Sequence, residues 1–296
     1  PVKQDLIIPK TEKVMEALNS WAEKRISPSS LNTYLRNPVQ FYQQYVLGLD
    51  QFEEAEETVG ARVLGNIVHK SLEELYKPLL NKILIPSDIK PLLEKLETVV
   101  EECFKAEYKS GEYKKGKNYL IYKIVYSFVE NVLKNDLKMA ENSEFVIHSL
   151  EQNVKVDFRL ANGREVKIGG IIDRIDSVNG RKRIIDYKTG FVDEKALNIN
   201  SEKLEKVFTE NKFSLPLQLL LYAEMFFRNA ENQFVQFGIY PLKYPKKGVI
   251  SLKIDKEFEF DNEILNWIDQ PLSGLIEEIL NPEIPFTPIR EIVESD

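Results

Sequence analysis

A β-hairpin is predicted around Asn179-Gly180, and it constrains the fold more than any other segment of the chain. The residues before the turn, 170–176, read GIIDRID, and those after it, 184–190, read IIDYKTG. An Asn-Gly pair between β-branched apolar runs favours a hairpin because both residues accept the positive φ of a type I′ turn. Two paired strands with acids inside apolar runs are therefore expected.

The register of this hairpin brings two acids and a lysine to one face. With the turn at its centre, Val178 faces Arg181, and counting back along both strands places Asp173 opposite Asp186. A four-residue loop centred on the same pair keeps this register. Lys188 points to the same face as Asp186 because side chains alternate along a strand.

Opposed carboxylates need a partner. Two of them about 4 Å apart repel by about 4 kcal/mol at an effective dielectric constant near 20, and like charges directly opposite each other destabilise a sheet. A divalent cation offsets this repulsion. An adjacent ammonium group then suits a reaction in which negative charge develops.

An exposed charged hairpin is the alternative, with Asp173 paired to Arg174 or Arg181 and Lys188 in solvent. Apolar neighbours argue against it, because they predict strands covered on both faces, where acids need partners. These neighbours are Ile171, Ile172, Ile175, Ile184 and Ile185.

Composition indicates a globular chain. Its 296 residues, 43% of them apolar, suffice for one large domain or a domain with a helical extension. The single cysteine, Cys103, excludes an internal disulfide framework and a cysteine-based metal site. With no apolar run of membrane-span length and no signal-peptide pattern, we expect a soluble, cytoplasmic protein. Because it begins at Pro1, we take the chain as a piece of a longer one.

Hydrophobic periodicity predicts a mainly helical first half, residues 1–145, followed by a sheet. Ser27-Pro28 opens a helix expected to run through Tyr34, Phe41 and Tyr45 to a stop at Gly48. The acidic stretch 50–57 is expected to connect it to the next helix. Further helices are expected at about 59–80, 90–110, 118–140, 216–227 and 262–280, and strands at about 145–159, 165–178, 182–189, 233–240 and 248–254. This order predicts an α/β fold with a mixed central sheet flanked by helices.

His69 is one of only two histidines, and it lies mid-helix on a stripe with Leu72 and Tyr76. Gly65, one turn earlier, lets backbone or substrate approach closely. A histidine on an apolar face is commonly a core residue, but beside a carboxylate pair it becomes a candidate third metal ligand. Both readings remain open from the sequence.

Gln218 and Tyr222 form a polar pair at i and i+4 on one helix face. These two residues either form the polar edge of a packed helix or belong to the same site as the acids and the lysine.

The segment 105–123 carries six lysines and two glutamates, interleaved with tyrosines. Lys114, Lys115 and Lys117 beside Tyr113 suit single-stranded nucleic acid, through phosphate neutralisation and base stacking. A solvated helical surface is the alternative. With a net charge of −7, the chain is not expected to bind nucleic acid indiscriminately.

Four motifs in this order resemble the RecB-type branch of the PD-(D/E)XK nuclease superfamily. They are Gly-x-x-x-His at 65–69, Gly-x-x-Asp-Arg-Ile-Asp at 170–176, Asp-Tyr-Lys-Thr-Gly at 186–190 and Gln-x-x-x-Tyr at 218–222.

Three flanking segments are similar to the C-terminal nuclease domain of AddB-like helicase–nuclease subunits. They are residues 26–34, 45–49 and 281–286, and the resemblance covers about residues 26–290. It implies a restriction-endonuclease-like fold, with residues 1–296 forming a single nuclease domain. Its helical portion, 1–145, carries His69, and its sheet core, 146–296, carries the acids, the lysine and the C-terminal helix.

The resemblance also implies roles for these residues. Asp173, Asp186 and Lys188 would be catalytic, with Lys188 orienting the attacking water. The metal, Mg²⁺ with Mn²⁺ as a substitute, would be held by His69, Asp173, Asp186 and the backbone carbonyl of Tyr187. Residues that would support the site or contact DNA are Gln218, Tyr222 and Glu151.

One departure from the AddB-like pattern concerns cysteine. Those nucleases often carry four cysteines around an iron–sulfur cluster, whereas here Asn37-Pro38 stands where the first would be, and no cysteine follows Cys103. No iron–sulfur cluster is therefore expected.

We expect a metal-dependent DNA nuclease, exonuclease-like, in DNA end processing and recombinational repair. Its partners would be DNA with free ends and a helicase domain or subunit. The alternatives are a catalytically silent module that binds DNA or a helicase partner, and a pure interaction scaffold.

Overall fold

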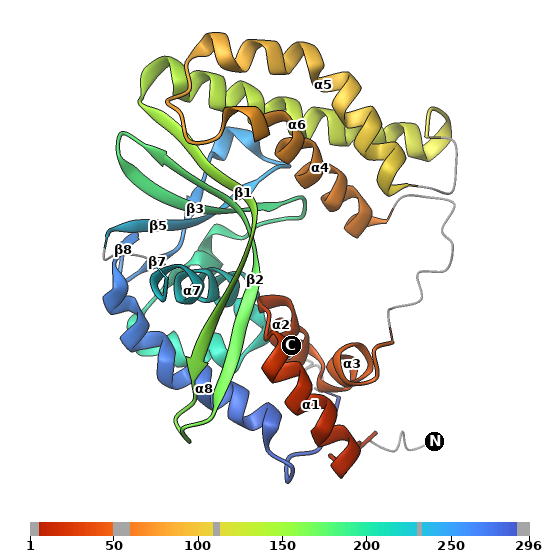
Figure 1. Cartoon of the computed structure of the whole chain (residues 1–296), viewed down its shortest axis with the longest axis vertical. Helices are drawn as coiled ribbons and strands as arrows, with labels where there is room; N and C mark the ends of the chain where they lie inside the picture. Colours follow the sequence, from red (N-terminus) through yellow and green to blue (C-terminus); the bar gives the residue numbers. More distant parts are fainter. Residues whose placement is uncertain (1–5, 50–59, 109–112, 230–232, 289–296) are drawn as a thin grey trace, which may run out of the picture.

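The computed structural model describes residues 6–49, 60–108, 113–229 and 233–288. A mixed β-sheet lies at its centre with helices on both sides (Figure 1), so the predicted fold class is confirmed. The helices are α1 (Glu12–Lys24), α2 (Pro28–Arg36), α3 (Pro38–Phe41), α4 (Ala61–Tyr76), α5 (Pro86–Glu107), α6 (Gly116–Asn142), α7 (Ser214–Phe227) and α8 (Leu265–Leu280). The strands are β1 (Phe145–Arg159), β2 (Glu165–Val178), β3 (Arg181–Lys188), β4 (Asn198–Ile199), β5 (Val235–Pro241), β6 (Ile250–Ser251), β7 (Lys253–Ile254) and β8 (Glu259–Phe260).

The main sheet has the strand order β1-β2-β3-β5-β6, with β8 also paired to β5. Neighbouring strands are antiparallel except β3 and β5, which run parallel. Parallel neighbours require a long crossover, and here it contains α7. β4 and β7 form a separate parallel pair.

The β2–β3 hairpin has the predicted register. Val178 pairs with Arg181, and the pairing continues to Arg174 opposite Ile185. Asn179 and Gly180 have φ angles of 51° and 78°, as a type I′ turn requires. The ladder ends at this pair, one residue short of Asp173 and Asp186, and both acids line the same cavity.

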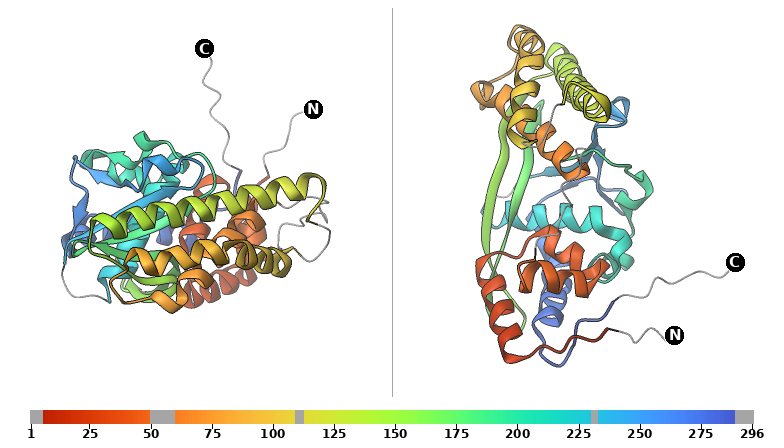
Figure 2. Two further views of the ribbon diagram at one scale, coloured as in Figure 1. Left: turned by 90° about the horizontal axis from the view of Figure 1, so that it is seen from above. Right: turned by 90° about the vertical axis from the view of Figure 1, so that its right-hand side faces the viewer.

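Two hydrophobic cores pack against the two faces of the sheet. One joins the sheet to α1, α2, α7 and α8, and the other joins it to α4, α5 and α6, as Figures 1 and 2 show. Because side chains alternate between the two faces of a strand, each strand contributes to both cores: Ile184 packs in the first and its neighbour Ile185 in the second. Ile171 is an exception at 47% exposed. The expectation that both faces are covered is wrong for this residue, because Ile171 lines the cavity that holds the acids.

The helix expected from Pro28 to Gly48 is broken at Asn37-Pro38. Proline disfavours helical backbone at the preceding residue, so α2 ends at Arg36. The Asn37 side chain then caps α3 by accepting a hydrogen bond from the Gln40 amide at 3.1 Å. A π-helical turn, Tyr42–Val46, follows, and Gly48 ends it with a φ of 65°.

Other boundaries differ locally. The strand expected at 248–254 is divided between β6 and β7, which belong to different sheets. The connection between β3 and α7, which no pattern predicted, contains short 3₁₀ helices at Glu194–Leu197, Ser201–Phe208 and Asn211–Phe213. Three more 3₁₀ turns lie at Lys77–Leu79, Pro245–Lys247 and Asn262–Ile264. The expected acidic connector at 50–57 lies outside the described residues. Within the described ranges, no helix has the length and hydrophobicity that crossing a membrane requires.

Candidate active site

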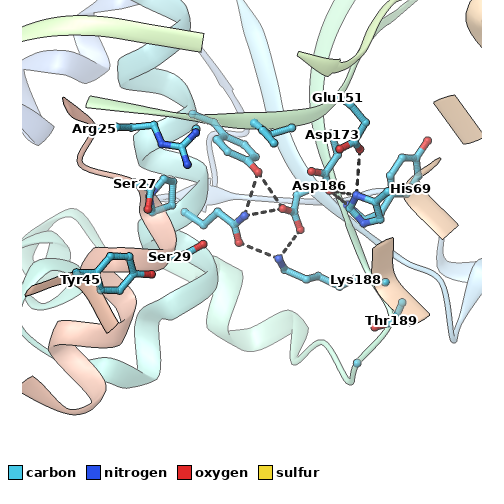
Figure 3. Close-up of a pocket in the computed structure, with 18 residues that line it drawn as sticks. Arg25, Ser27, Ser29, Tyr45, His69, Glu151, Asp173, Asp186, Lys188 and Thr189 are labelled. Atoms are coloured by element: carbon cyan, nitrogen blue, oxygen red, sulfur yellow. Dashed lines mark hydrogen bonds and ion pairs between the residues drawn. The ribbon is translucent and has the colours of Figure 1, made fainter. Parts of the chain in front are cut away.

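A cavity of about 530 Å³ lies between the sheet, α4, α7 and the start of α2. One wall carries the acids and the lysine of the hairpin, and the facing wall carries Arg25, Ser27, Ser29 and Tyr45 (Figure 3). The residues of the first wall include His69, Glu151, Asp173, Asp186, Lys188, Gln218 and Tyr222.

Asp173 and Asp186 are almost fully buried, at 6% and 1% exposed. The backbone amide of Tyr187 donates a hydrogen bond of 2.8 Å to Asp173 Oδ2. Burial and the neighbouring Asp186 raise the pKa of Asp173 to about 8. An acid held in this way binds a proton, or another cation, more readily than a solvated one.

Glu151 joins this pair from β1. It lies between the paired positions Leu150–Arg174 and Gln152–Ile172, which places it opposite Asp173. Its φ is 47°, a conformation rare for residues other than glycine. Three carboxylates thus lie side by side on β1, β2 and β3.

His69 completes the acidic cluster from α4. Its Nδ1 lies 3.0 Å from Glu151 Oε1 and 3.7 Å from Asp173 Oδ2. Burial alone lowers the pKa of His69, but Asp173 and Glu151 outweigh it and raise the pKa to about 9. One ligand atom from each of His69, Glu151 and Asp173 lies within 4.8 Å of the other two. This donor set fits a divalent cation, with oxygens that suit Mg²⁺ and an imidazole that suits Mn²⁺.

Lys188 lies beside Asp186, and α7 holds both. Lys188 Nζ is 2.8 Å from Asp186 Oδ2 and donates to Gln218 Oε1 at 2.9 Å. The Gln218 amide and the Tyr222 hydroxyl both donate to Asp186 Oδ1, at 2.7 and 3.1 Å. Burial lowers the pKa of Lys188, but Asp186 outweighs it and keeps the pKa above its ordinary value, so the amine is charged.

A buried ionic network behind the pocket connects β2 to α4 and α6. Arg174, 1% exposed, donates to Asp136 on α6, to Asp176 and to the Tyr187 hydroxyl. Tyr76, two turns after His69 on α4, donates to the same Asp136 at 2.6 Å. Sequence reasoning offered solvent or Asp173 as the environment of Arg174 and missed Asp136. A charged residue inside an apolar strand was the available signal.

The facing wall is held against β2 by backbone contacts. The Ile26 amide donates to the Lys167 carbonyl at 2.7 Å, and the Gly169 amide donates to the Ile26 carbonyl at 2.9 Å. A Cβ atom at Gly169 would lie 2.8 Å from the Val154 carbonyl oxygen, so only glycine fits there. Arg25, which lines the pocket from this wall, was missed by sequence reasoning, and a glycine pair inside a strand was the signal for it.

The structure does not support the stacking role expected for Tyr113. Its ring is 8% exposed and packs on Phe104 with centroids 5.2 Å apart, while its hydroxyl donates to Glu101. Lys114 also pairs with Glu101, at 3.2 Å. Lys115 and Lys117 are exposed. A ring packed against its own helices cannot stack on a base.

Residues 25–291 match the family model of the PD-(D/E)XK nuclease superfamily. The chain belongs to this superfamily, as its mixed sheet with clustered acids and a lysine also indicates.

Curated relatives share about a quarter of their aligned residues with the chain. The B-type subunit of an ATP-dependent helicase/deoxyribonuclease from Pediococcus pentosaceus is 24% identical over 219 residues, 70% of this chain and 17% of the relative. A protein of the same name from Streptococcus agalactiae is 28% identical over 171 residues, 56% of this chain and 14% of the relative. An uncharacterised protein of Rickettsia conorii is 26% identical over 201 residues, 64% of this chain and 22% of the relative. The chain therefore spans less than a quarter of the length of these relatives.

Proposed function

We propose that the chain is a metal-dependent deoxyribonuclease that hydrolyses phosphodiester bonds within a helicase–nuclease. The observation that carries this proposal is the arrangement of Glu151, Asp173 and Asp186 on three adjacent strands, with Lys188 and His69 in the same pocket. Membership of a nuclease superfamily and the names of the helicase/deoxyribonuclease relatives support it.

The acidic cluster would hold Mg²⁺, or Mn²⁺ in its place, with His69, Asp173 and Asp186 as ligands. Glu151 lies close enough to contribute, and the Tyr187 carbonyl is proposed as a further ligand. A bound divalent ion neutralises the scissile phosphate and lowers the pKa of a coordinated water. The raised pKa values of His69 and Asp173 support this role, because they mean that the cluster attracts positive charge.

Lys188 would place its ammonium group where the transition state gains negative charge. Asp186 and Gln218 fix its Nζ at 2.8 and 2.9 Å, so the amine is oriented before substrate binds. From this position Lys188 orients the attacking water and stabilises the phosphate oxygens. Tyr222 and Gln218 hold the shared carboxylate in place.

We further propose an exonuclease-like enzyme that acts on free DNA ends in end processing and recombinational repair, beside a helicase domain or subunit. Lys114, Lys115 and Lys117 remain proposed contacts to DNA away from the pocket, now without Tyr113. Because Lys114 already pairs with Glu101, it is a weaker candidate than the exposed Lys117.

A cleavage assay tests the function. The purified chain is incubated with end-labelled single-stranded, duplex and covalently closed circular DNA, in Mg²⁺, in Mn²⁺ and in EDTA. We expect cleavage only with metal and only of DNA with ends. Asp186→Asn should abolish it, whereas Asp157→Asn, an exposed acid on β1 outside the pocket, should not. Metal-independent cleavage, or normal activity of Asp186→Asn, would refute the proposal. An inert chain that still binds DNA would identify a silent module.

A further inference from the structure

The two parallel strands of the sheet end together beside the pocket. Lys188 is the last residue of β3 and pairs with Pro241, the last residue of β5. The Leu242 amide then donates to the Lys188 carbonyl at 2.9 Å, which fixes the turn after β5 against the lysine. The segments that follow β3 and β5 therefore both begin beside Lys188.

An aromatic residue follows each strand end at the same distance along the chain. Phe191 comes three residues after Lys188, and Tyr244 comes three residues after Pro241. Their rings meet edge to face, with centroids 6.5 Å apart and planes at 90°. Phe191 is 73% exposed and Tyr244 is 38% exposed. We call this pair the Phe191–Tyr244 platform.

Two lysines lie against the Tyr244 ring of this platform. The Nζ atoms of Lys243 and Lys247 lie 6.0 and 5.6 Å from the centre of the Tyr244 ring. Lys247 also pairs with Glu194 at 2.5 Å, whereas neither Lys243 nor Lys246 forms an ion pair in the part of the chain that the structure describes. In a chain with a net charge of −7, unpaired lysines next to an acidic pocket are suited to hold a polyanion.

We propose that the Phe191–Tyr244 platform is a base-stacking subsite for single-stranded DNA next to Lys188. Phe191 offers its open ring to a base, Tyr244 braces that ring from the side, and Lys243 neutralises a phosphate. Single strands are the fitting substrate because their base faces are free to stack on aromatic rings, while lysines follow the backbone. This inference rests on the proposed nuclease function and names how that site receives its substrate.

The platform also explains how single strands can be bound without Tyr113, whose ring is buried. A protein surface, such as that of a helicase, is the competing occupant of an exposed aromatic pair. Lysines without acidic partners favour DNA, and the experiment below separates the two.

Binding of a fluorescein-labelled oligo-dT tests the proposal by anisotropy, in EDTA so that no metal-dependent cleavage occurs. Phe191→Ala should weaken binding by about 5- to 150-fold, equivalent to the loss of one stacked base at about 1–3 kcal/mol. The loss should be equal at every salt concentration. Phe191→Tyr should retain most of the affinity. Phe234→Ala is the matched control, because Phe234 is 66% exposed at the opposite end of β5 and should bind as wild type.

An oligonucleotide of the same length made of abasic sites provides the decisive comparison. It keeps the phosphates but has no bases, so wild type and Phe191→Ala should bind it equally weakly. Lys243→Ala should instead weaken both probes and lower the slope of log affinity against log salt by about 0.7.

Three outcomes would overturn the stacking subsite: no binding of oligo-dT by wild type, unchanged affinity of Phe191→Ala, or an equal loss on both probes. Unchanged affinity would assign the platform to a protein partner. These results are separate from the cleavage assay. Wild-type cleavage with an unaffected Phe191→Ala variant removes the subsite alone, and an inert wild type with the predicted binding losses removes the nuclease function alone.

Discussion

Glu151 and Asp173 lie opposite each other on β1 and β2, and His69 Nδ1 reaches both, at 3.0 and 3.7 Å. The positive φ of Glu151 shows that the backbone accepts strain at this position. Without the histidine, the buried Asp173 and the half-buried Glu151 would face each other with no cation between them. Either a protonated imidazole or a metal ion therefore relieves the repulsion within this cluster.

Replacing His69 tests the metal site. His69→Ala should weaken Mn²⁺ binding by about 10- to 100-fold, whether the imidazole binds the ion or orients a ligand. Calorimetric titration of Mn²⁺ measures the change. His148→Ala is the control, because the other histidine of the chain contacts Ser177 outside the pocket. Equal Mn²⁺ affinity in His69→Ala and wild type would make His69 a structural residue.

The substitution Arg174→Ala should destabilise the fold strongly. Its loss leaves Asp136 and Asp176 buried and short of a partner, which costs about 3–5 kcal/mol of unfolding free energy. Urea denaturation gives this value. Tyr76→Phe removes only one hydrogen bond to Asp136 and should cost about 0.5–1.5 kcal/mol. If the two variants are equally stable, the network does not anchor α4 to β2.

Glu224 on α7 should make stability depend on pH. Burial raises its pKa to about 7 despite the ion pair with Arg228, whereas the unfolded value is near 4.5. The folded state therefore binds the proton more tightly, and the stability this provides is complete below about pH 4.5 and lost as pH rises to about 7. The slope from this group is at most about 1.4 kcal/mol per pH unit.

Glu224→Gln isolates this contribution. The amide keeps the shape and the acceptor for Arg228 but does not ionise, so the variant should gain stability relative to wild type as pH rises from 5 to 8. Denaturant unfolding at several pH values reveals the difference. A constant difference between the two proteins across this range would rule out a raised pKa.

Arg25 should contact the DNA backbone from the facing wall of the pocket. It forms no ion pair in the described ranges, so its guanidinium is available to a phosphate. Arg25→Ala should lower the slope of log affinity against log salt by about 0.7 for single strands. Lys24→Ala, an adjacent exposed cation that does not line the pocket, should leave the slope unchanged. A reduced slope in Lys24→Ala alone would place the DNA on the other side of α1.

The hairpin was predictable because its information is local. Asn179-Gly180 sets the turn, the turn sets the register, and the register brings Asp173 and Asp186 together. Membership of the PD-(D/E)XK superfamily was likewise readable from four short motifs. The break in the helix at Asn37-Pro38 was also signalled locally, by the proline. It was not predicted because apolar residues continue at helical spacing on both sides of it.

Contacts between residues far apart in the chain could not be predicted from the sequence. Nothing in the spacing of Tyr113 shows that its ring folds back onto Phe104, because basic residues around it suggest an exposed surface equally well. The pairing of Arg174 with Asp136 joins residues from different elements, and no periodicity links them. The position of Arg25 depends on a backbone bridge between Ile26 and Ile168, for which the glycine pair at 169–170 was an indirect signal that does not identify the partner segment.

From the crossover between β3 and β5 we expect a particular order of assembly of the site during folding. The β2–β3 hairpin closes a short loop, whereas pairing β3 with β5 closes the much longer loop that contains α7, at a larger entropic cost. Asp173 and Asp186 should therefore meet early, and Gln218 and Tyr222 should reach Asp186 late. A partly folded chain would hold the opposed acids without the helix that orients Lys188, and the pocket would be complete only after α7 has docked.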